Sequence, residues 1–416
     1  MTFALQKSES EYLFILLQGK ELKMGLKVRR RFLVIAVFLL LFAFCSFSFS
    51  EEEETFVISF HKMVYFIIPH RDLGEVHFIT HLPVITKDSI PLFIRLSEEE
   101  NYNAKVTGFN FKKVRENEDQ NLIRFTLKNC AKDEKVYIVF EVYALKKFSN
   151  YSDMPKAVSL SSYSNLSDEL KYYLQPSSAV QSDAEQIRKK AFDILYGNWE
   201  GNVIEILKDI IRFTGNEIKY EGGMQTALDA LTEGHAVCTG KANLAVALCR
   251  ALGIPARVLF GDTTHYIVEI WIPNYGWVRG ESTQGIFPYP KHLYTVCWIA
   301  NIDDENYGGE RGGVIAYWGF EDIDWSDAYW DFSYPEAKGD EEFATVKGRK
   351  DSVDALFEKG KEVWRLFCQL KNAGLIEDDS NLFSQYQKLY FEALLDNDIQ
   401  GALQYADEAI SEENTF

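Results

Sequence analysis

The stretch GHAVCTGKANLAVALCRALGIPARVLFG, residues 234–261, decides how this sequence folds. Small residues precede Cys238, which opens an apolar segment, and Gly253 and Pro255 stop that segment. The spacing predicts a helix from about Cys238 to Leu252, followed by a strand. A thiol at a helix N-terminus has a lowered pKa, whereas free cysteine is also among the most buried residue types. The stretch alone therefore leaves open whether Cys238 is reactive or part of the core.

A cysteine nucleophile needs a base, and the base needs a group that orients it. His265 opens the next predicted strand, and Glu281 follows the strand after the turn PNYG. If Trp271 faces Trp277 in a hairpin, His265 and Glu281 have the same side-chain parity and lie about one diagonal step apart. Glu269 shares that parity but lies about 13 Å along the strand from His265. Glu281 is therefore the better partner.

Each of these residues also has an ordinary structural interpretation. A cysteine at a helix start more often packs, a histidine at a strand edge is more often incidental, and Glu281 fits a solvated turn. The order and spacing of the three together favour a catalytic interpretation. Cys249 lies about 16 Å further along the same helix on its apolar side, so we expect it to be core.

These motifs resemble the transglutaminase-like superfamily. The resemblance rests on AVCTGKANLAVALCRALGIPARVLFG, HYIVEIWIPNYGWV and GESTQG, and it extends over about residues 177–290. It implies an α+β core with papain-type chemistry, in which Cys238, His265 and an acidic residue form the catalytic triad. The usual acidic residue of the family is Asp, and Glu281 stands at that position here.

Two further features of the site follow from the resemblance. Tyr266 stands after the histidine where Ala is common, and it is expected to narrow the cleft. No upstream oxyanion donor is assigned, because Gln225 is a candidate that also fits an exposed helix amide. The backbone N–H of Cys238 would serve as a donor.

The patterning predicts a multidomain chain. Residues 1–50 have the basic, apolar and small-residue order of a signal peptide or an uncleaved N-terminal anchor. Residues 51–165 alternate as in a β-sandwich domain. Residues 166–345 form the predicted transglutaminase-like catalytic domain, and residues 346–416 a C-terminal α-helical domain with three amphipathic helices. A Ser- and Tyr-rich linker is predicted over residues 149–180.

Glycines mark the predicted ends of helices ahead of Cys238. Gly215 is expected to end the helix that begins near residue 201, and Gly234 the short helix after it.

Charge and cysteine usage limit the possible partners. The formal net charge is −18, which argues against nucleic acid, because phosphate binding needs clustered Lys and Arg. The cysteines are too sparse for a disulfide scaffold. His235 and Cys238 form an H-x-x-C pair with no second pair, and four further histidines lack metal-ligand spacing: His61, His70, His77 and His81. No metal and no cofactor are predicted.

The sequence therefore predicts an exported thiol acyl-transfer enzyme that acts on a protein or peptide substrate. Hydrolysis of a peptide or carboxamide bond is favoured, since microbial members of the family often look protease-like, and cross-linking to an amine stays open. Membrane contact is expected only through the N-terminal segment, and the substrate-binding residues and oligomeric state are not predicted. The alternative is a non-catalytic cell-surface module whose aromatic-rich residues 285–345 bind peptide or glycan.

Overall fold

The computed structural model describes residues 53–96, 105–113, 121–149, 151–197, 201–223, 225–261, 265–305, 318–333, 337–376 and 381–412. The predicted export segment, residues 1–50, lies outside the described residues. Among the helices of the described part, none is both long and apolar enough to cross a membrane.

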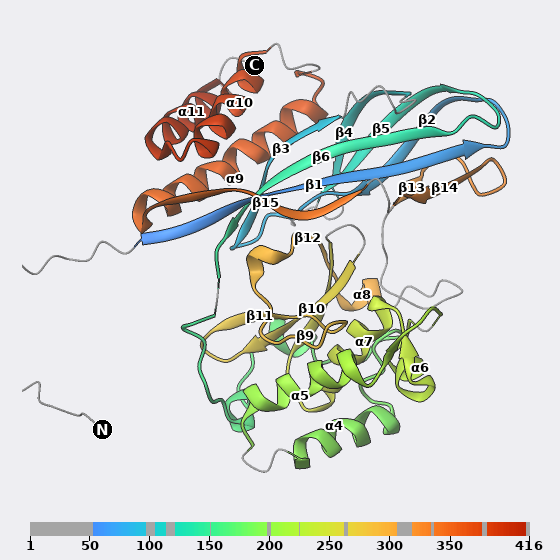
Figure 1. Ribbon diagram of the computed structural model, residues 1–416, viewed down its shortest axis with the longest axis vertical. Coiled ribbons are helices and arrows are strands. Elements are labelled where there is room, and N and C mark those ends of the chain that lie inside the picture. The colour runs from blue at the N-terminus through green and yellow to red at the C-terminus, as the bar shows by residue number, and fades with distance from the viewer. Residues whose placement is uncertain are drawn as a thin grey trace, which may run out of the picture. The chain divides into compact units, whose positions relative to one another are not determined.

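Two antiparallel sheets combine N-terminal strands with three strands from much later in the chain (Figure 1). One sheet has the order β14-β1-β6-β3, with β15 also paired to β1, and the other has the order β13-β2-β5-β4. The strands are β1 Glu53–Pro69, β2 Leu73–His81, β3 Ser89–Leu96, β4 Val106–Lys113, β5 Asn121–Cys130, β6 Val136–Lys147, β13 Gly319–Phe320, β14 Ala328–Phe332 and β15 Lys338–Arg349.

The two sheets pack face to face through aromatic side chains. The ring centroids of Tyr65 and Phe78 are 4.9 Å apart, and those of Phe125 and Phe140 are also 4.9 Å apart. The Tyr65 hydroxyl shares a hydrogen bond of 2.7 Å with the Thr80 hydroxyl, which satisfies both polar groups inside this core. The strand-rich N-terminal region that alternation predicts is therefore present.

The later strands lie with this strand-rich region. In β1, Tyr65 faces Phe332 of β14, and Phe56 faces Val346 of β15. Residues up to 345 were predicted to belong to the catalytic domain, so the pairing of β14 and β15 with β1 differs from that boundary. Alternation identifies a strand but not its partner, which here is more than 250 residues away. The division into separate domains stays a prediction.

Three C-terminal helices cover this region: α9 Lys350–Asn372, α10 Leu382–Leu395 and α11 Ile399–Ser411. Phe357 of α9 lies 5.2 Å from Phe56 between ring centroids, and Phe391 of α10 stacks on Phe93 at 5.6 Å. Helices are thus present where amphipathic spacing predicts them: α9 and α10 pack on the strands, and α11 packs mainly on α9 and α10.

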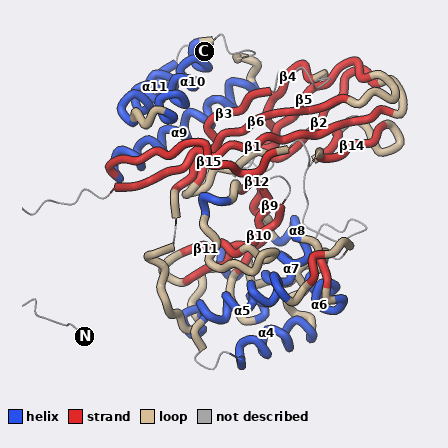
Figure 2. The backbone as a smooth tube through the Cα atoms, viewed as in Figure 1, coloured by secondary structure: helices blue, strands red, loops and turns tan. Residues whose placement is uncertain are grey.

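The remaining elements form an α+β core around one central helix, α7 Cys238–Ala251 (Figure 2). Helices α4, α5 and α6 pack on α7 together with strands β9 and β10. A helix whose residues are mostly small or apolar on every face can be buried on all sides. Every α7 residue from Thr239 to Arg250 is buried. The helices of this core are η1 Leu160–Tyr163, α3 Asp168–Tyr172, α4 Glu185–Gly197, α5 Val203–Asn216, α6 Ala227–Glu233, η2 Lys291–Leu293 and α8 Ile302–Glu305.

The main sheet of the core has the order β11-β10-β9-β12. Its strands are β9 Ala256–Gly261, β10 His265–Ile272, β11 Gly276–Gly280 and β12 Val296–Ile299, and a short parallel pair is formed by β7 Lys219–Tyr220 and β8 His235–Ala236. Trp271 faces Trp277 across β10 and β11, which confirms the hairpin register that the sequence predicts.

The segment predicted as a linker packs against the core. Tyr151 is buried, Ala179 and Val180 are fully buried, and the Tyr163 hydroxyl donates to the Trp271 carbonyl at 2.9 Å. A Ser- and Tyr-rich composition indicates irregular backbone, but it does not show which tyrosines become buried. Most other described residues of the segment are exposed or half-buried, so the linker stays a prediction.

The two glycines predicted as helix ends behave differently. Gly234 caps α6 in the left-handed conformation with φ of 73°, as predicted. Gly215 instead lies inside α5, which ends at Asn216. A Cβ on Gly215 would lie 2.4 Å from the backbone nitrogen of Gly285, so this glycine permits a close backbone approach and is not a cap.

Candidate active site

Cys238 is the first residue of α7, and its thiol is only partly exposed. Val237 precedes it in extended conformation, and no side chain caps the helix start. The backbone N–H groups of Thr239 and Tyr266 hydrogen-bond the Cys238 sulfur. A helix N-terminus favours negative charge, so this position suits a thiolate.

His265 and Glu281 come together at the open end of the β10–β11 hairpin. His265 Nε2 lies 2.6 Å from Glu281 Oε2, and the His265 side chain also hydrogen-bonds the Cys238 side chain. With Nε2 taken by Glu281, Nδ1 is the ring nitrogen that remains for the thiol. The structure thus brings all three predicted site residues into one hydrogen-bonded chain.

The charges of Cys238, His265 and Glu281 shift the pKa values of the thiol and the imidazole in opposite directions. Burial alone would raise the pKa of the Cys238 thiol, but the hydrogen bond and charge of His265 bring that pKa below its usual value. Burial alone would lower the pKa of His265, but Cys238 and Glu281 raise it to about 10. Both shifts favour a thiolate–imidazolium pair over a neutral pair.

A tight loop after β11 holds the Glu281 side chain. Glu281 Oε1 accepts a hydrogen bond of 2.7 Å from the Thr283 backbone N–H. The backbone N–H and carbonyl of Glu281 also pair with Ile286, at 2.9 Å and 3.1 Å. Gly285, with φ of 76°, makes the turn possible. Only 1% of the Glu281 side chain is exposed, so its position is set by packing and hydrogen bonds.

The competing carboxylate, Glu269, has a different role. Its Oε2 lies 2.7 Å from Arg257 Nη2, and its Oε1 lies 3.5 Å from Arg279 Nε. Burial alone would raise the pKa of Glu269, but these two guanidinium groups lower it below its usual range. The structure therefore pairs His265 with Glu281 and not with Glu269.

The other cysteines of the described part are buried. Cys249 is fully buried in α7, and burial raises the pKa of its thiol, as expected for core. Cys238 is thus the most accessible of these thiols. Within the described ranges, no group of His, Cys, Asp and Glu has the arrangement to hold a metal ion.

Two secondary candidates are placed as follows. Tyr266 is buried, with its ring 4.9 Å from that of Phe260, so its side chain belongs to the core beside the thiol. The Gln225 carbonyl accepts a hydrogen bond of 2.6 Å from Asn243 Nδ2 of α7. That contact fixes the Gln225 backbone ahead of α6 and leaves the oxyanion role of its side chain a prediction.

Lys241, which lies on α7 after Cys238, was not predicted as a residue of the site. Its side chain is buried, and its Nζ donates to the Gly215 carbonyl at 3.0 Å. The sequence did carry a signal for Lys241, because it is a single lysine among the small and apolar residues of a predicted apolar helix. A buried ammonium needs a partner, so such a lysine indicates a specific contact.

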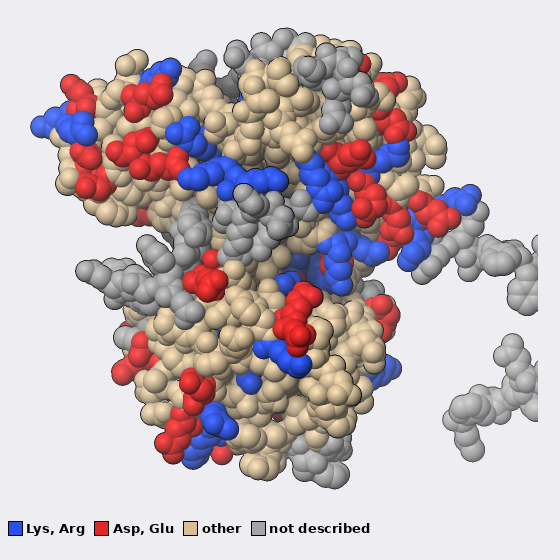
Figure 3. Space-filling model, turned by 180° about the vertical axis from the view of Figure 1, so that it is seen from behind, with Lys and Arg blue, Asp and Glu red and all other residues tan. Residues whose placement is uncertain are grey.

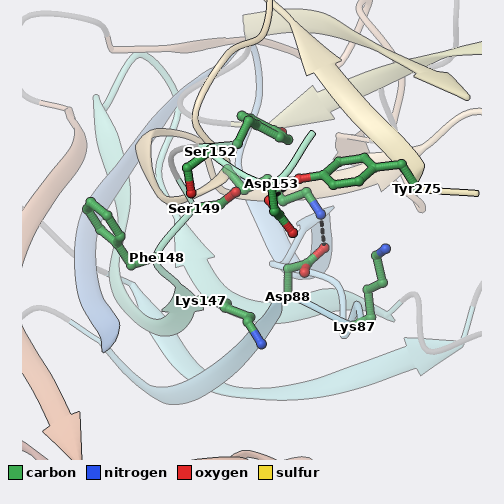
Figure 4. A pocket seen from close by; sticks show the side chains of 10 residues that line it. Lys87, Asp88, Lys147, Phe148, Ser149, Ser152, Asp153 and Tyr275 are labelled. Carbon is green, nitrogen blue, oxygen red and sulfur yellow. Dashed lines mark hydrogen bonds and ion pairs between the residues drawn. The ribbon is translucent and has the colours of Figure 1, made fainter. Parts of the chain in front are cut away.

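A separate polar pocket of about 330 Å³ is not lined by Cys238, His265 or Glu281 (Figure 4). Its walls are formed by Lys87, Asp88, Lys147, Phe148, Ser149, Tyr151, Ser152, Asp153, Tyr275 and Lys291. Asp88 and Lys291 form an ion pair of 2.6 Å, and the Tyr275 hydroxyl donates to Asp153 at 2.9 Å. Several polar side chains that line the pocket are thus already paired with one another.

Basic and acidic side chains are interspersed over the described residues of the face in Figure 3. This is a surface of mixed charge on a chain that is acidic as a whole. The expectation that nucleic acid is not a partner stays a prediction.

Comparisons with known proteins bear on the segment that carries the site. A family model described as the transglutaminase-like superfamily matches residues 197–281. No curated protein matches the chain.

Two solved structures show limited likeness. One is a candidate cysteine protease from Cytophaga hutchinsonii, with 18% identity over 68% of this chain and 91% of that chain and a TM-score of 0.45. The other is the periplasmic domain of TgpA from Pseudomonas aeruginosa, with 14% identity over 58% of this chain and 90% of that chain and a TM-score of 0.28. Since both TM-scores lie below 0.5, neither likeness decides fold or activity. The family match, which ends at Glu281 and spans Cys238 and His265, identifies residues 197–281 as a domain of the transglutaminase-like superfamily.

Proposed function

We propose that Cys238, His265 and Glu281 are the catalytic triad of an exported thiol enzyme that cleaves or transfers the acyl group of a peptide or carboxamide bond. The observation that carries the proposal is the continuous hydrogen-bonded chain from the thiol to the buried carboxylate. The match of residues 197–281 to the transglutaminase-like superfamily supports it.

In the first half-reaction the Cys238 thiolate attacks the substrate carbonyl carbon, and the carbonyl oxygen takes up the negative charge. The backbone N–H of Cys238, the first of α7, has no intrahelical acceptor and is available to that oxyanion. The C–N bond then breaks, and His265 gives its proton to the leaving amine. A thioester on Cys238 and a neutral imidazole remain.

In the second half-reaction the neutral His265 takes a proton from the incoming nucleophile. The nucleophile oxygen or nitrogen bonds to the thioester carbon, the C–S bond breaks, and the thiolate and imidazolium are restored. Water yields hydrolysis and a primary amine yields cross-linking. We favour hydrolysis. Glu281 keeps the ring oriented and stabilises the imidazolium in both halves.

The proposal places the enzyme outside the cytoplasm and gives it a protein or peptide substrate and no cofactor. Its support for export is the basic, apolar and small-residue order of residues 27–50. N-terminal sequencing of protein from the native host is expected to find a start near Glu51. Recovery of a chain that retains residues 27–44 would favour an anchor instead.

Thiol labelling tests the enzyme proposal without a known substrate. Purified protein is treated with iodoacetamide at mildly acidic pH, and labelling of Cys238 and Cys249 is compared by peptide mass spectrometry. Cys238 is expected to react much faster, and His265→Ala is expected to remove that advantage. Equal, slow labelling of both cysteines in the wild type would favour the non-catalytic binding module.

A screen then identifies the reaction. The protein is tested against peptide and glutamine-amide libraries, with and without a primary amine, and Cys238→Ala is the control. A product formed equally well by Cys238→Ala would exclude Cys238 as the nucleophile.

A further inference from the structure

The proposed reaction leaves one buried charge beside the triad without a role. Lys241 follows Cys238 by about one helical turn, so both side chains lie on the same side of α7. Lysine is almost never fully buried unless it is paired, yet Lys241 is only 1% exposed. Its position next to the site therefore needs an explanation.

The ammonium group of Lys241 binds the end of a neighbouring helix. Lys241 Nζ donates to the Gly215 carbonyl at 3.0 Å, in the last turn of α5. The last carbonyls of a helix lack intrahelical partners and carry partial negative charge. Lys241 thus satisfies one such carbonyl and places a positive charge at the negative end of α5.

The loop that carries Glu281 rests on the same helix end. A Cβ on Gly215 would lie 2.4 Å from the Gly285 nitrogen, so the two backbones are in direct contact. The Gly285 N–H donates to the Glu281 carbonyl at 2.9 Å. Lys241, Gly215, Gly285 and Glu281 therefore form one continuous path of contacts from α7 to the backbone of Glu281.

The charges around Glu281 also support a role for Lys241 in the site. In the reactive state the thiolate of Cys238 and the imidazolium of His265 cancel, which leaves the charge of Glu281 buried beside the negative end of α5. Burial alone would lower the pKa of Lys241, and the charge of Glu281 acts against that shift. An ammonium held at the Gly215 carbonyl therefore acts on the buried Glu281 charge through space and not as a contact ion pair.

We propose that Lys241 is a positioning residue for the triad: its ammonium holds the end of α5 on which the Glu281 loop rests, and its charge acts through space on the Glu281 carboxylate. This rests on the proposed function. The charged and titratable groups that face Glu281 are His265 from β10, Lys241 from α7 and, through the imidazole, Cys238. Arg212 of α5 is exposed and pairs with Asp209, so it faces away.

The test measures the rate of Cys238 alkylation by iodoacetamide as a function of pH in the full-length protein. Lys241→Met removes both the charge and the donor to Gly215. We expect the pH of half-maximal alkylation to rise by about one unit. At a given pH on the acid side of the profile, the reaction is then about tenfold slower. Lys291→Met is the matched control, because Lys291 is another buried lysine but pairs with Asp88 away from the triad. We expect it to keep the wild-type profile.

A double-mutant cycle separates positioning from a merely structural role. If Lys241 acts through Glu281, Lys241→Met has no further effect on the profile in a Glu281→Gln background. A structural role would lower thermal stability in both backgrounds and leave the profiles of folded protein unchanged. Where Lys241→Met does not fold, Lys241→Gln replaces it, since it removes the charge but keeps a donor.

The outcomes are distinct. A wild-type-like profile in the neutral Lys241 variants, or a shift of equal size with and without Glu281, overturns the role of Lys241 while the triad stands. An ordinary, unshifted profile for Cys238 in the wild type overturns the triad and this role with it.

Discussion

His265 and Glu281 meet where the β10–β11 hairpin ends, with Nε2 of the imidazole 2.6 Å from Oε2 of the carboxylate. The register that faces Trp271 with Trp277 brings them together. The second oxygen of Glu281 is held by the Thr283 N–H at 2.7 Å, so the longer side chain is fixed at both oxygens. A glutamate therefore fills the place where the resemblance implies an aspartate.

Replacing Glu281 by Gln tests this relationship. The amide keeps the size of the side chain but loses the charge that stabilises the imidazolium, so we expect turnover of a substrate from the screen to fall about 100-fold. Cys238→Ala and His265→Ala are expected to cost more. Glu281→Asp keeps the charge and is the matched control, expected to retain more activity than Glu281→Gln. Wild-type turnover in Glu281→Gln would remove Glu281 from the triad.

The pH dependence of turnover follows from the thiolate–imidazolium pair. The pKa of Cys238 lies below its usual value, so activity rises with pH as the thiolate forms. The pKa of His265 is raised to about 10, so activity falls only as the pH rises through that value and the leaving amine loses its proton donor. We expect a bell-shaped kcat/KM profile with a broad plateau between the two limbs. Loss of activity already near the ordinary pKa of a free histidine would contradict the pairing.

The contact between Gly215 and Gly285 predicts a sensitive position far from Cys238 in sequence. A methyl group at Gly215 overlaps the Gly285 backbone, so Gly215→Ala is expected to displace the Glu281 loop and lower stability by about 1–3 kcal/mol. Gly222→Ala is the matched control, because a Cβ there meets nothing within 4 Å. Thermal melting and Cys238 alkylation measure the two effects. Equal behaviour of the two variants would show that the backbones separate without cost.

The two buried carboxylates of the hairpin are expected to separate stability from reactivity. Glu269→Gln leaves Arg257 and Arg279 without their counter-charge, so we expect a loss of about 3 kcal/mol in unfolding free energy. Alkylation of folded protein at Cys238 is expected to stay unchanged. Glu281→Gln is expected to show the opposite pattern, with a large effect on reactivity. Similar effects of both variants on reactivity would place Glu269 in the site as well.

Local patterns predicted the central helix and the hairpin well, because Gly253, Pro255 and the PNYG turn mark their ends within a short stretch. The same local patterns explain why spacing could predict that Cys238, His265 and Glu281 lie together. The roles of Gly215 and Lys241 depend on contacts between α5, α7 and the loop after β11, which no local spacing shows. The partners of β1 were not predictable for the same reason.

One edge of β1 is completed only by strands that come last in the chain, β14 and β15. During synthesis that edge, 17 residues long, has to wait for the whole transglutaminase-like segment to follow. An unpaired strand edge is a template for association with other chains. Because export would deliver the N-terminal strands first, the protein is expected to depend on a chaperone or on rapid completion of translocation. Loss of the residues after 318 would remove β13, β14 and β15 and leave that edge of β1 exposed for association.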